Sequence, residues 1–176
     1  MKKSLVLLSA LVLALFAVVQ ADTDKEIERK AEFIVSLVDN IEWPEDAKPG
    51  EDEEILIYVV GDCPELTKLA ELAEKHAEEG TRVKVEAVSP DDDLSASRIL
   101  YLPTDDFSVL AKVLKKISGS KIVTVADADE FARFGAMIAF RQDQKDSKLH
   151  YEVNKLVVDS VGISLSSKIL KDADLI

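Results

Sequence analysis

Few side chains in this sequence are of the types that enzymes use for chemistry. The single cysteine, Cys63, precedes a predicted helix, where the helix N-terminus would favour a reactive thiolate; the alternative is an inert thiol in a strand-to-helix turn. Two histidines, His76 and His150, are too few for a His-rich zinc site, and one cysteine is too few for a Cys-based site. We therefore expect no catalytic residue, no metal and no cofactor, although an enzyme using Cys63 or carboxylates stays open as an alternative.

Acidic side chains could bind ligands at two places. Asp91-Asp92-Asp93 could hold a cation, but this run lacks the spaced ligands and the glycine of a calcium loop, so we favour a solvated loop. Asp127 and Asp129 follow a predicted buried strand, in the region where open α/β sheets bind ligands. Helix capping would explain these two aspartates equally well.

Several common binding sites are excluded outright. The closest two of the six glycines are eleven residues apart, so neither a dinucleotide fingerprint nor a phosphate-binding P-loop is present. No Gly-x-Ser-x-Gly element is present either, which removes the anchor of an α/β-hydrolase triad. The formal net charge of −12 gives the molecule a field that repels phosphate groups, so we expect no nucleic-acid partner.

The first 21 residues have the pattern of a secretory signal peptide. Lys2-Lys3 precedes an apolar run over residues 5–19, and Val19-Gln20-Ala21 places small residues at the cleavage site. A membrane anchor is the alternative, but a spanning helix needs roughly 20 apolar residues. We expect cleavage after Ala21, a mature chain over residues 22–176, and a periplasmic location.

The elements that would position these residues alternate between helices and strands. Apolar residues at helical spacing predict a helix from residue 24 that ends at Trp43-Pro44, because the residue before a proline is driven out of helical conformation. Further helices are predicted from Pro64 to Gly80, over 107–117, over 156–161, and after Ser166-Ser167. Strands are predicted over 55–60, 83–87, 99–102 and 122–125, followed by a hairpin of 136–140 and 149–153. The fold class is α/β: one domain with a mixed, mostly parallel sheet of about five or six strands flanked by helices.

Four blocks of the chain, taken in order, carry a resemblance to a known protein family. The first runs from Lys30 into the Ile41-Glu42-Trp43-Pro44 element, and the second is the apolar strand that ends in Gly61-Asp62-Cys63-Pro64. The third runs from Ile122 through Asp127, Phe131 and Gly135 to Phe140, and the last joins Tyr151-Glu152-Val153-Asn154 to residues 163–170. Together these blocks resemble the YfiR family of small periplasmic proteins. Ala136 stands where the family has a second glycine, and Ala96-Ser97 stand where family members often carry a cysteine, so an internal disulfide is not expected here.

This resemblance implies a regulator in cyclic-di-GMP signalling rather than an enzyme. YfiR-like proteins repress an inner-membrane diguanylate cyclase by binding its periplasmic sensor domain, and an outer-membrane lipoprotein can sequester them. The family is usually dimeric, so the resemblance also implies a homodimer. A periplasmic small-ligand-binding protein that uses the loops at the strand ends is the alternative function.

We predict a partner-binding surface around Phe134, Met137, Glu152 and Asn154. Strand alternation would turn Glu152 and Asn154 outward if Tyr151 and Val153 face the core, beside the apolar anchors Phe134 and Met137. In the alternative, Asn154 caps the following helix and Phe134 is buried. Trp43 is a further candidate contact, although a core aromatic that fixes the end of the first helix is the interpretation we favour.

Overall fold

The computed structural model describes residues 23–50, 53–78, 80–141 and 148–176, and the predicted signal peptide lies outside them. The described chain opens in a helix over residues 23–36, which we call the N-terminal helix. The short elements are η1 (Leu37–Asp39), β1 (Ile41–Glu42), β8 (Ser164–Leu165), α5 (Ser167–Lys171) and β9 (Asp174–Leu175). The longer ones are β2 (Ile55–Val60), α2 (Glu65–Glu78), β3 (Val83–Val88), β4 (Ile99–Leu102), α3 (Phe107–Lys116), β5 (Val123–Ala126), β6 (Ile138–Arg141), β7 (His150–Val153) and α4 (Lys155–Ser160).

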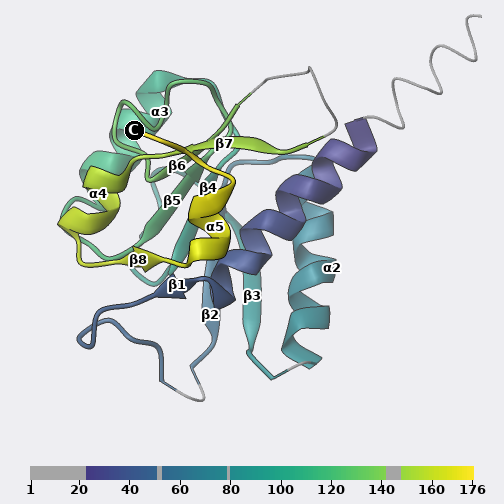
Figure 1. Cartoon of the computed structure of the whole chain (residues 1–176). Helices are drawn as coiled ribbons and strands as arrows, with labels where there is room; N and C mark the ends of the chain where they lie inside the picture. The colour runs from purple at the N-terminus through teal and green to yellow at the C-terminus, as the bar shows by residue number, and fades with distance from the viewer. Residues whose placement is uncertain (1–22, 51–52, 79, 142–147) are drawn as a thin grey trace, which may run out of the picture.

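Seven strands form one mixed sheet in the order β3-β2-β4-β5-β6-β7-β9 (Figure 1). The neighbours from β3 to β6 are parallel, β6 and β7 form the predicted antiparallel hairpin, and β9 adds to β7 in parallel. The predicted α/β class, with a mixed and mostly parallel sheet in a single domain, is confirmed. The sheet is larger than the predicted five or six strands because the last residues of the chain form β9.

Helices cover both faces of the sheet, which explains why its central strands are apolar without alternation. On one face, Ile57, Ile99 and Tyr101 pack with the N-terminal helix, α2 and α5. On the other face, Leu100 and Leu102 pack with α3 and with the segment over residues 128–136. All four residues of β4 are buried, so this strand lies at the centre of two separate apolar cores.

The N-terminal helix ends earlier than its apolar spacing predicts. The α-helix stops at residue 36, η1 follows, and Ile41 and Glu42 pair with Leu165 and Ser164 of β8. The side chain of Asn40 explains the stop, because its amide donates to the carbonyl of Ser36 at 2.7 Å and its oxygen accepts from the Ser166 hydroxyl at 2.6 Å. The prediction that this helix continues to Trp43-Pro44 is therefore wrong.

The strand order reverses next to β2, because β3 lies on one side of it and β4 on the other. In open α/β sheets the carboxyl ends of strands at such a reversal border a crevice that suits a binding site. In Figure 1 this end of the sheet lies at the top, as does the beginning of the N-terminal helix. Within the described residues, no helix is both long enough and apolar enough to cross a membrane.

Candidate functional site

A buried charged cluster joins the N-terminal helix to the carboxyl ends of β4 and β5. Lys30, only 6% exposed, places its Nζ 2.9 Å from Oδ2 of Asp127 and 2.8 Å from Oε1 of Glu26. The Tyr101 hydroxyl donates to the same Asp127 oxygen at 3.0 Å. The other oxygen of Asp127, Oδ1, is buried and accepts no hydrogen bond within the described part of the chain. Asp127 therefore anchors a helix to the sheet, and its charge is compensated mainly by Lys30.

The surroundings hold Lys30 charged and Tyr101 neutral. Burial acts to lower the pKa of Lys30, but its hydrogen bonds to Glu26 and Asp127 and the charges of those two carboxylates outweigh burial and raise this pKa above its ordinary value. Burial, followed by the charge of Asp127, raises the pKa of Tyr101. Lys30 is thus charged at neutral pH, and Tyr101 serves as a hydrogen-bond donor.

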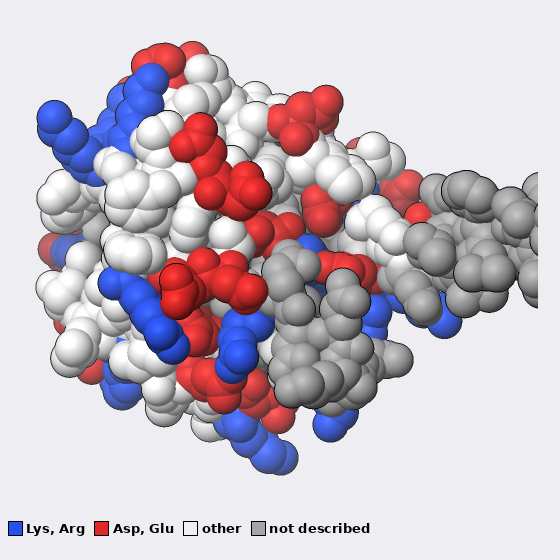
Figure 2. All heavy atoms as spheres, turned by 90° about the horizontal axis from the view of Figure 1, so that it is seen from above, with Lys and Arg blue, Asp and Glu red and all other residues white. Residues whose placement is uncertain are grey.

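A cavity of about 600 Å³ opens beside this cluster, and its lining includes Thr104, Asp105, Asp127, Asp129 and Phe131. The carboxyl ends of β4 and β5 therefore form the wall of a hollow with three aspartates and one phenyl ring. Figure 2 looks down on this end of the molecule and shows acidic side chains across the middle of the face. Asp127 and Asp129 thus lie where the sequence placed them, at a cavity at the strand ends.

Cys63 lies at the same end of the sheet, between β2 and α2, and is half-buried. Burial and the nearby carboxylate of Glu65 raise the pKa of the thiol to about 12. These effects outweigh the helix N-terminus, which would favour the thiolate. Of the two interpretations of Cys63, the structure supports the inert thiol.

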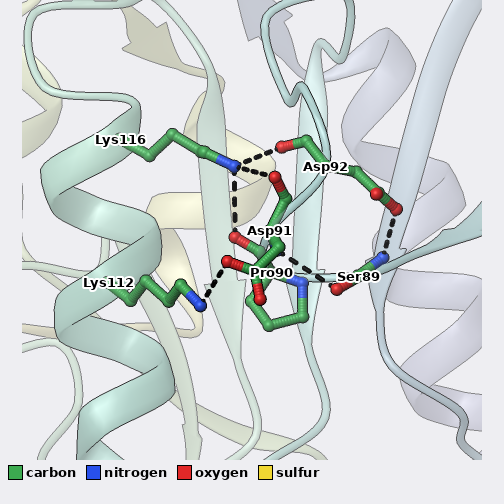
Figure 3. Close-up of polar contacts among 6 residues, drawn as sticks. All are labelled: Ser89, Pro90, Asp91, Asp92, Lys112 and Lys116. Atoms are coloured by element: carbon green, nitrogen blue, oxygen red, sulfur yellow. Dashed lines mark hydrogen bonds and ion pairs between the residues drawn. The ribbon is translucent and has the colours of Figure 1, made fainter.

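The Asp91-Asp92-Asp93 run is organised by lysines of α3 (Figure 3). Lys116 donates to the backbone carbonyls of Pro90, Asp91 and Asp92, and Lys112 forms an ion pair with the Asp91 carboxylate. The Asp92 carboxylate accepts from the Ser89 amide at 2.7 Å. No described group of three His, Cys, Asp or Glu residues has the arrangement of a metal site. The loop is thus an ordinary surface loop that a helix holds through its lysines.

Of the predicted partner-binding residues, Phe134 is the one with exposed apolar surface. Its ring is 55% exposed and meets the Phe107 ring, itself 51% exposed, with 4.9 Å between centroids and an interplanar angle of 76°. Phe107 is the first residue of the helix that the sequence predicts over residues 107–117. Asp106 caps α3, so Phe107 is its first helical residue, and the buried residues of α3 are Leu110 and Val113 further along the helix.

The prediction that Glu152 is turned outward is wrong, and Met137 is not available as an exposed apolar anchor beside it. Glu152 is 6% exposed and Met137 is 4% exposed. Strand alternation does turn Glu152 away from Tyr151 and Val153, but the opposite face of the sheet, on which Glu152 lies, is covered as well. Arg133 lies over it at 3.5 Å, and Oε2 of Glu152 is buried without a partner in the described part of the chain. Met137 belongs to the core and is held through its backbone amide, which donates to Thr124 at 2.8 Å.

Asn154 has the capping role that the sequence left open as an alternative. Its side-chain oxygen accepts from the Val157 amide at 3.0 Å, and its side-chain amide donates to the Ala132 carbonyl at 2.8 Å. Asn154 thereby joins α4 to the turn that carries Phe134. A direct contact of Met137, Glu152 or Asn154 with a partner stays a prediction, but their burial and hydrogen bonds argue for structural roles.

Trp43 lies at the opposite end of the sheet and is half-buried against the core. The Arg98 guanidinium lies 5.9 Å from the centroid of its ring, and Glu53 holds Arg98 through a 2.7 Å ion pair. Trp43 also lines a cavity of about 450 Å³ together with Arg82. The favoured core role fits this packing, and a partner contact of Trp43 stays a prediction.

Together, the open sheet and its cavity define an α/β domain that carries its candidate site at the carboxyl ends of its strands. The chain belongs to the YfiR/HmsC-like family, whose profile matches residues 28–174. This match confirms the family resemblance seen in the sequence, and it points to a periplasmic regulator of cyclic-di-GMP signalling. No curated protein matches the chain at a significant level.

Two solved structures share the fold at low sequence identity. One is described as the ABC domain in complex with L-Trp from Streptococcus pneumonia, with a TM-score of 0.55 and 16% identity over 85% of this chain and 59% of that chain. The other is a conserved domain protein from Vibrio cholerae O1 biovar El Tor, with a TM-score of 0.54, 16% identity and the same coverage. This chain therefore spans less than two thirds of the length of either structure, and the likeness concerns the fold alone.

Proposed function

We propose that the protein represses a membrane diguanylate cyclase by binding the periplasmic sensor domain of the cyclase. Membership of the YfiR/HmsC-like family over residues 28–174 is the observation that carries this proposal. Two further partners follow from the same family and belong to the proposal: a second copy of the chain, and an outer-membrane lipoprotein that relieves the repression.

The proposal describes a regulator and not an enzyme. The side chains that the sequence offered for chemistry support this, because burial and Glu65 keep Cys63 a thiol. Asp127 is committed to Lys30 and Tyr101. An exposed aromatic pair fits a protein that works through contact with another protein, since large apolar residues in contact at a surface mark interaction sites.

Deleting the gene tests the proposal in cells. We expect cyclic-di-GMP and biofilm mass to rise in the deletion strain and to return to the wild-type level when the full-length gene is restored. A copy without residues 1–21 is the matched control, because it makes the same domain but should not reach the periplasm and should not complement. Unchanged cyclic-di-GMP in the deletion strain, with the cyclase expressed, would contradict the proposal.

A small-ligand-binding function is the second candidate, and the cavity of about 600 Å³ at the strand ends favours it. Ligand pockets typically measure about 300–1,000 Å³, so this cavity could hold a metabolite. The similar structure in complex with L-Trp suggests amino acids as the first compounds to screen. Isothermal calorimetry with the purified protein decides this: a saturable heat that disappears in Asp105→Asn, a change at an exposed residue of the cavity wall, would support a ligand site here.

A further inference from the structure

The two exposed phenylalanines come from separate elements and meet at the surface. Phe107 begins α3, and Phe134 lies in the turn that leads to β6. They make an edge-to-face contact at 4.9 Å, and each still leaves about half of its side chain exposed. Single exposed apolar residues are common. Two aromatic side chains that touch and both remain exposed to solvent form an apolar patch, which is typical of an interaction site.

Hydrogen bonds fix the backbone that carries each ring. The Asp106 side chain accepts from the Ser108 amide at 2.8 Å, which fixes the first turn of α3 under Phe107. The amide of Phe134 donates to the Phe131 carbonyl at 3.2 Å. In the same turn, Glu130 has φ of +67°, and it is the one non-glycine residue with positive φ among the described residues. A backbone that is already ordered loses little conformational freedom when a partner binds, which favours affinity.

Acidic side chains surround the pair. Asp105 and Asp106 immediately precede Phe107, and Asp129 and Glu130 lie in the turn that carries Phe134; all four are exposed. The one basic residue in that turn, Arg133, is engaged by Glu130 at 3.7 Å and by Glu152 at 3.5 Å. The aromatic pair therefore lies in a locally negative field, and Figure 2 shows that acidic side chains are numerous at this end of the molecule.

We propose that Phe107 and Phe134, with Asp105 and Glu130 at their rim, form the docking surface for the partner, and we call it the Phe107–Phe134 surface. Its chemistry fits a protein segment that carries an aliphatic or aromatic anchor next to Lys or Arg, because such a segment complements both the apolar rings and the negative rim. This inference rests on the proposed function and names the face that contacts the cyclase sensor domain. The same surface lies at the opposite end of the sheet from Trp43.

The test measures binding of the full-length exported protein to the purified periplasmic domain of the cyclase. The variant Phe107→Ala/Phe134→Ala removes both rings from positions that are half exposed, so its fold should persist, which circular dichroism and melting check. We expect its affinity to fall about 30-fold or more, the scale of losing a binding hot spot. Asp105→Lys should weaken binding about ten-fold, mainly through slower association, and the wild-type affinity should fall as salt is raised.

Glu71→Lys is the matched control, because it makes the same charge change at an exposed position of α2, away from the Phe107–Phe134 surface. We expect it to bind like the wild type. If the phenylalanine variant also binds like the wild type, or if Trp43→Ala alone abolishes binding, the surface is wrong while the proposed function stands. A change in the oligomeric state of the phenylalanine variant without a loss of affinity would make this face a contact between copies and would also overturn the inference. If the wild type itself does not bind the sensor domain, the proposed function fails and this inference fails with it.

Discussion

Residues of one type behave differently here because their neighbours differ. Asp105 is exposed at the rim of a cavity, whereas Asp127 is paired with a buried lysine and a tyrosine hydroxyl. Cys63 illustrates the limit of sequence reasoning at this scale. Its place before a helix was predictable, but the carboxylate of Glu65 and the burial that raise the pKa of the thiol depend on how α2 packs. Sequence position thus indicated where reactive groups lie, and packing determined whether they react.

The Cys63 thiol should react slowly with iodoacetamide in the folded protein. With a pKa near 12, the thiol is almost fully protonated at about pH 8, whereas a free cysteine with a pKa near 8.5 is partly thiolate. We expect alkylation of the native protein to be at least about a hundred-fold slower than in denaturant, as followed by mass spectrometry. Comparable rates in both conditions would show that the thiol is accessible and ionised.

Replacing Glu130 with glycine should make the folded protein more stable. The left-handed backbone at this position costs a non-glycine residue about 1–2 kcal/mol, and glycine would remove that cost. Glycine also makes the unfolded chain more flexible, which offsets part of this gain. We expect Glu130→Gly to stabilise the protein by about 1 kcal/mol, which corresponds to a rise in Tm of about 2–4 °C. Glu130→Ala is the control, because it removes the same carboxylate and keeps the backbone strain. Equal melting of the two variants would contradict this assignment of strain.

At the scale of elements, the longer helices and strands could be predicted from the sequence and the shortest strands could not. Apolar periodicity identified each helix and strand of four residues or more, including the hairpin of β6 and β7. The strands β1, β8 and β9 were missed because each has two residues, which is too short to show an alternating pattern. The hydrogen bonds that hold them come from distant parts of the chain. The exposure of Phe107 was not predictable for a related reason: helical spacing predicts a helix but does not show which of its apolar residues are covered.

The N-terminal helix should depend on Lys30. Lys30→Met leaves Asp127 as a buried carboxylate without its cation, and breaking a buried ion pair typically costs about 3–5 kcal/mol. Lys68→Met is the matched control on α2, because Lys68 also contacts two carboxylates but is far more exposed; an exposed pair is worth about 1 kcal/mol or less. Urea unfolding at neutral pH measures both. Similar losses for the two variants would argue against an anchoring role for Lys30.

The direction of the pKa shift of Lys30 determines how its contribution to stability depends on pH. The pKa of Lys30 is raised in the folded state, so its contribution is fully present below the unfolded pKa of about 10.4 and is lost as pH rises through the folded value. The stability difference between wild type and Lys30→Met should therefore be constant from about pH 7 to about pH 9 and should shrink only in stronger alkali.

Trp43 should contribute less than a fully buried tryptophan. Truncating a core aromatic costs about 3–5 kcal/mol, but Trp43 is only half-buried, so we expect about 1–3 kcal/mol for Trp43→Ala. Trp43→Phe should recover most of this loss, because a second aromatic ring can pack on the core and face Arg98. Thermal unfolding of both variants checks this. Lost cyclase repression by a Trp43→Ala protein that melts like the wild type would instead favour a partner contact.

At the scale of the whole molecule, the sequence indicated the fold class and the family, while the candidate site was only partly predictable. Asp127, Asp129 and Phe134 were chosen correctly as residues near the strand ends or at the surface. Glu152 and Met137 were misplaced because alternation gives the face on which a strand residue lies but not whether that face is covered. The rings of Phe107 and Phe134 meet across 27 positions of sequence, and no local pattern could have paired them.

The mature protein should begin at Asp22. The two lysines, the apolar run and the small residues before Asp22 predict cleavage by a signal peptidase and release into the periplasm. N-terminal sequencing of the protein from a periplasmic extract tests this directly, and Ala21→Arg should slow or block processing. Recovery of the uncut chain with Met1 from the membrane fraction would contradict both the cleavage and the location.

The contacts between the two ends of the chain also affect when the protein can fold. The Ser166 hydroxyl bonds Asn40 across 126 positions, and β1 pairs with β8 over a similar separation. A chain that is still emerging from a ribosome or a secretion channel therefore lacks the partner of its first strand until almost all of it has passed. Because parallel sheets and distant contacts slow folding, the chain should stay unfolded until residues 164–166 have emerged and should acquire its shape only then.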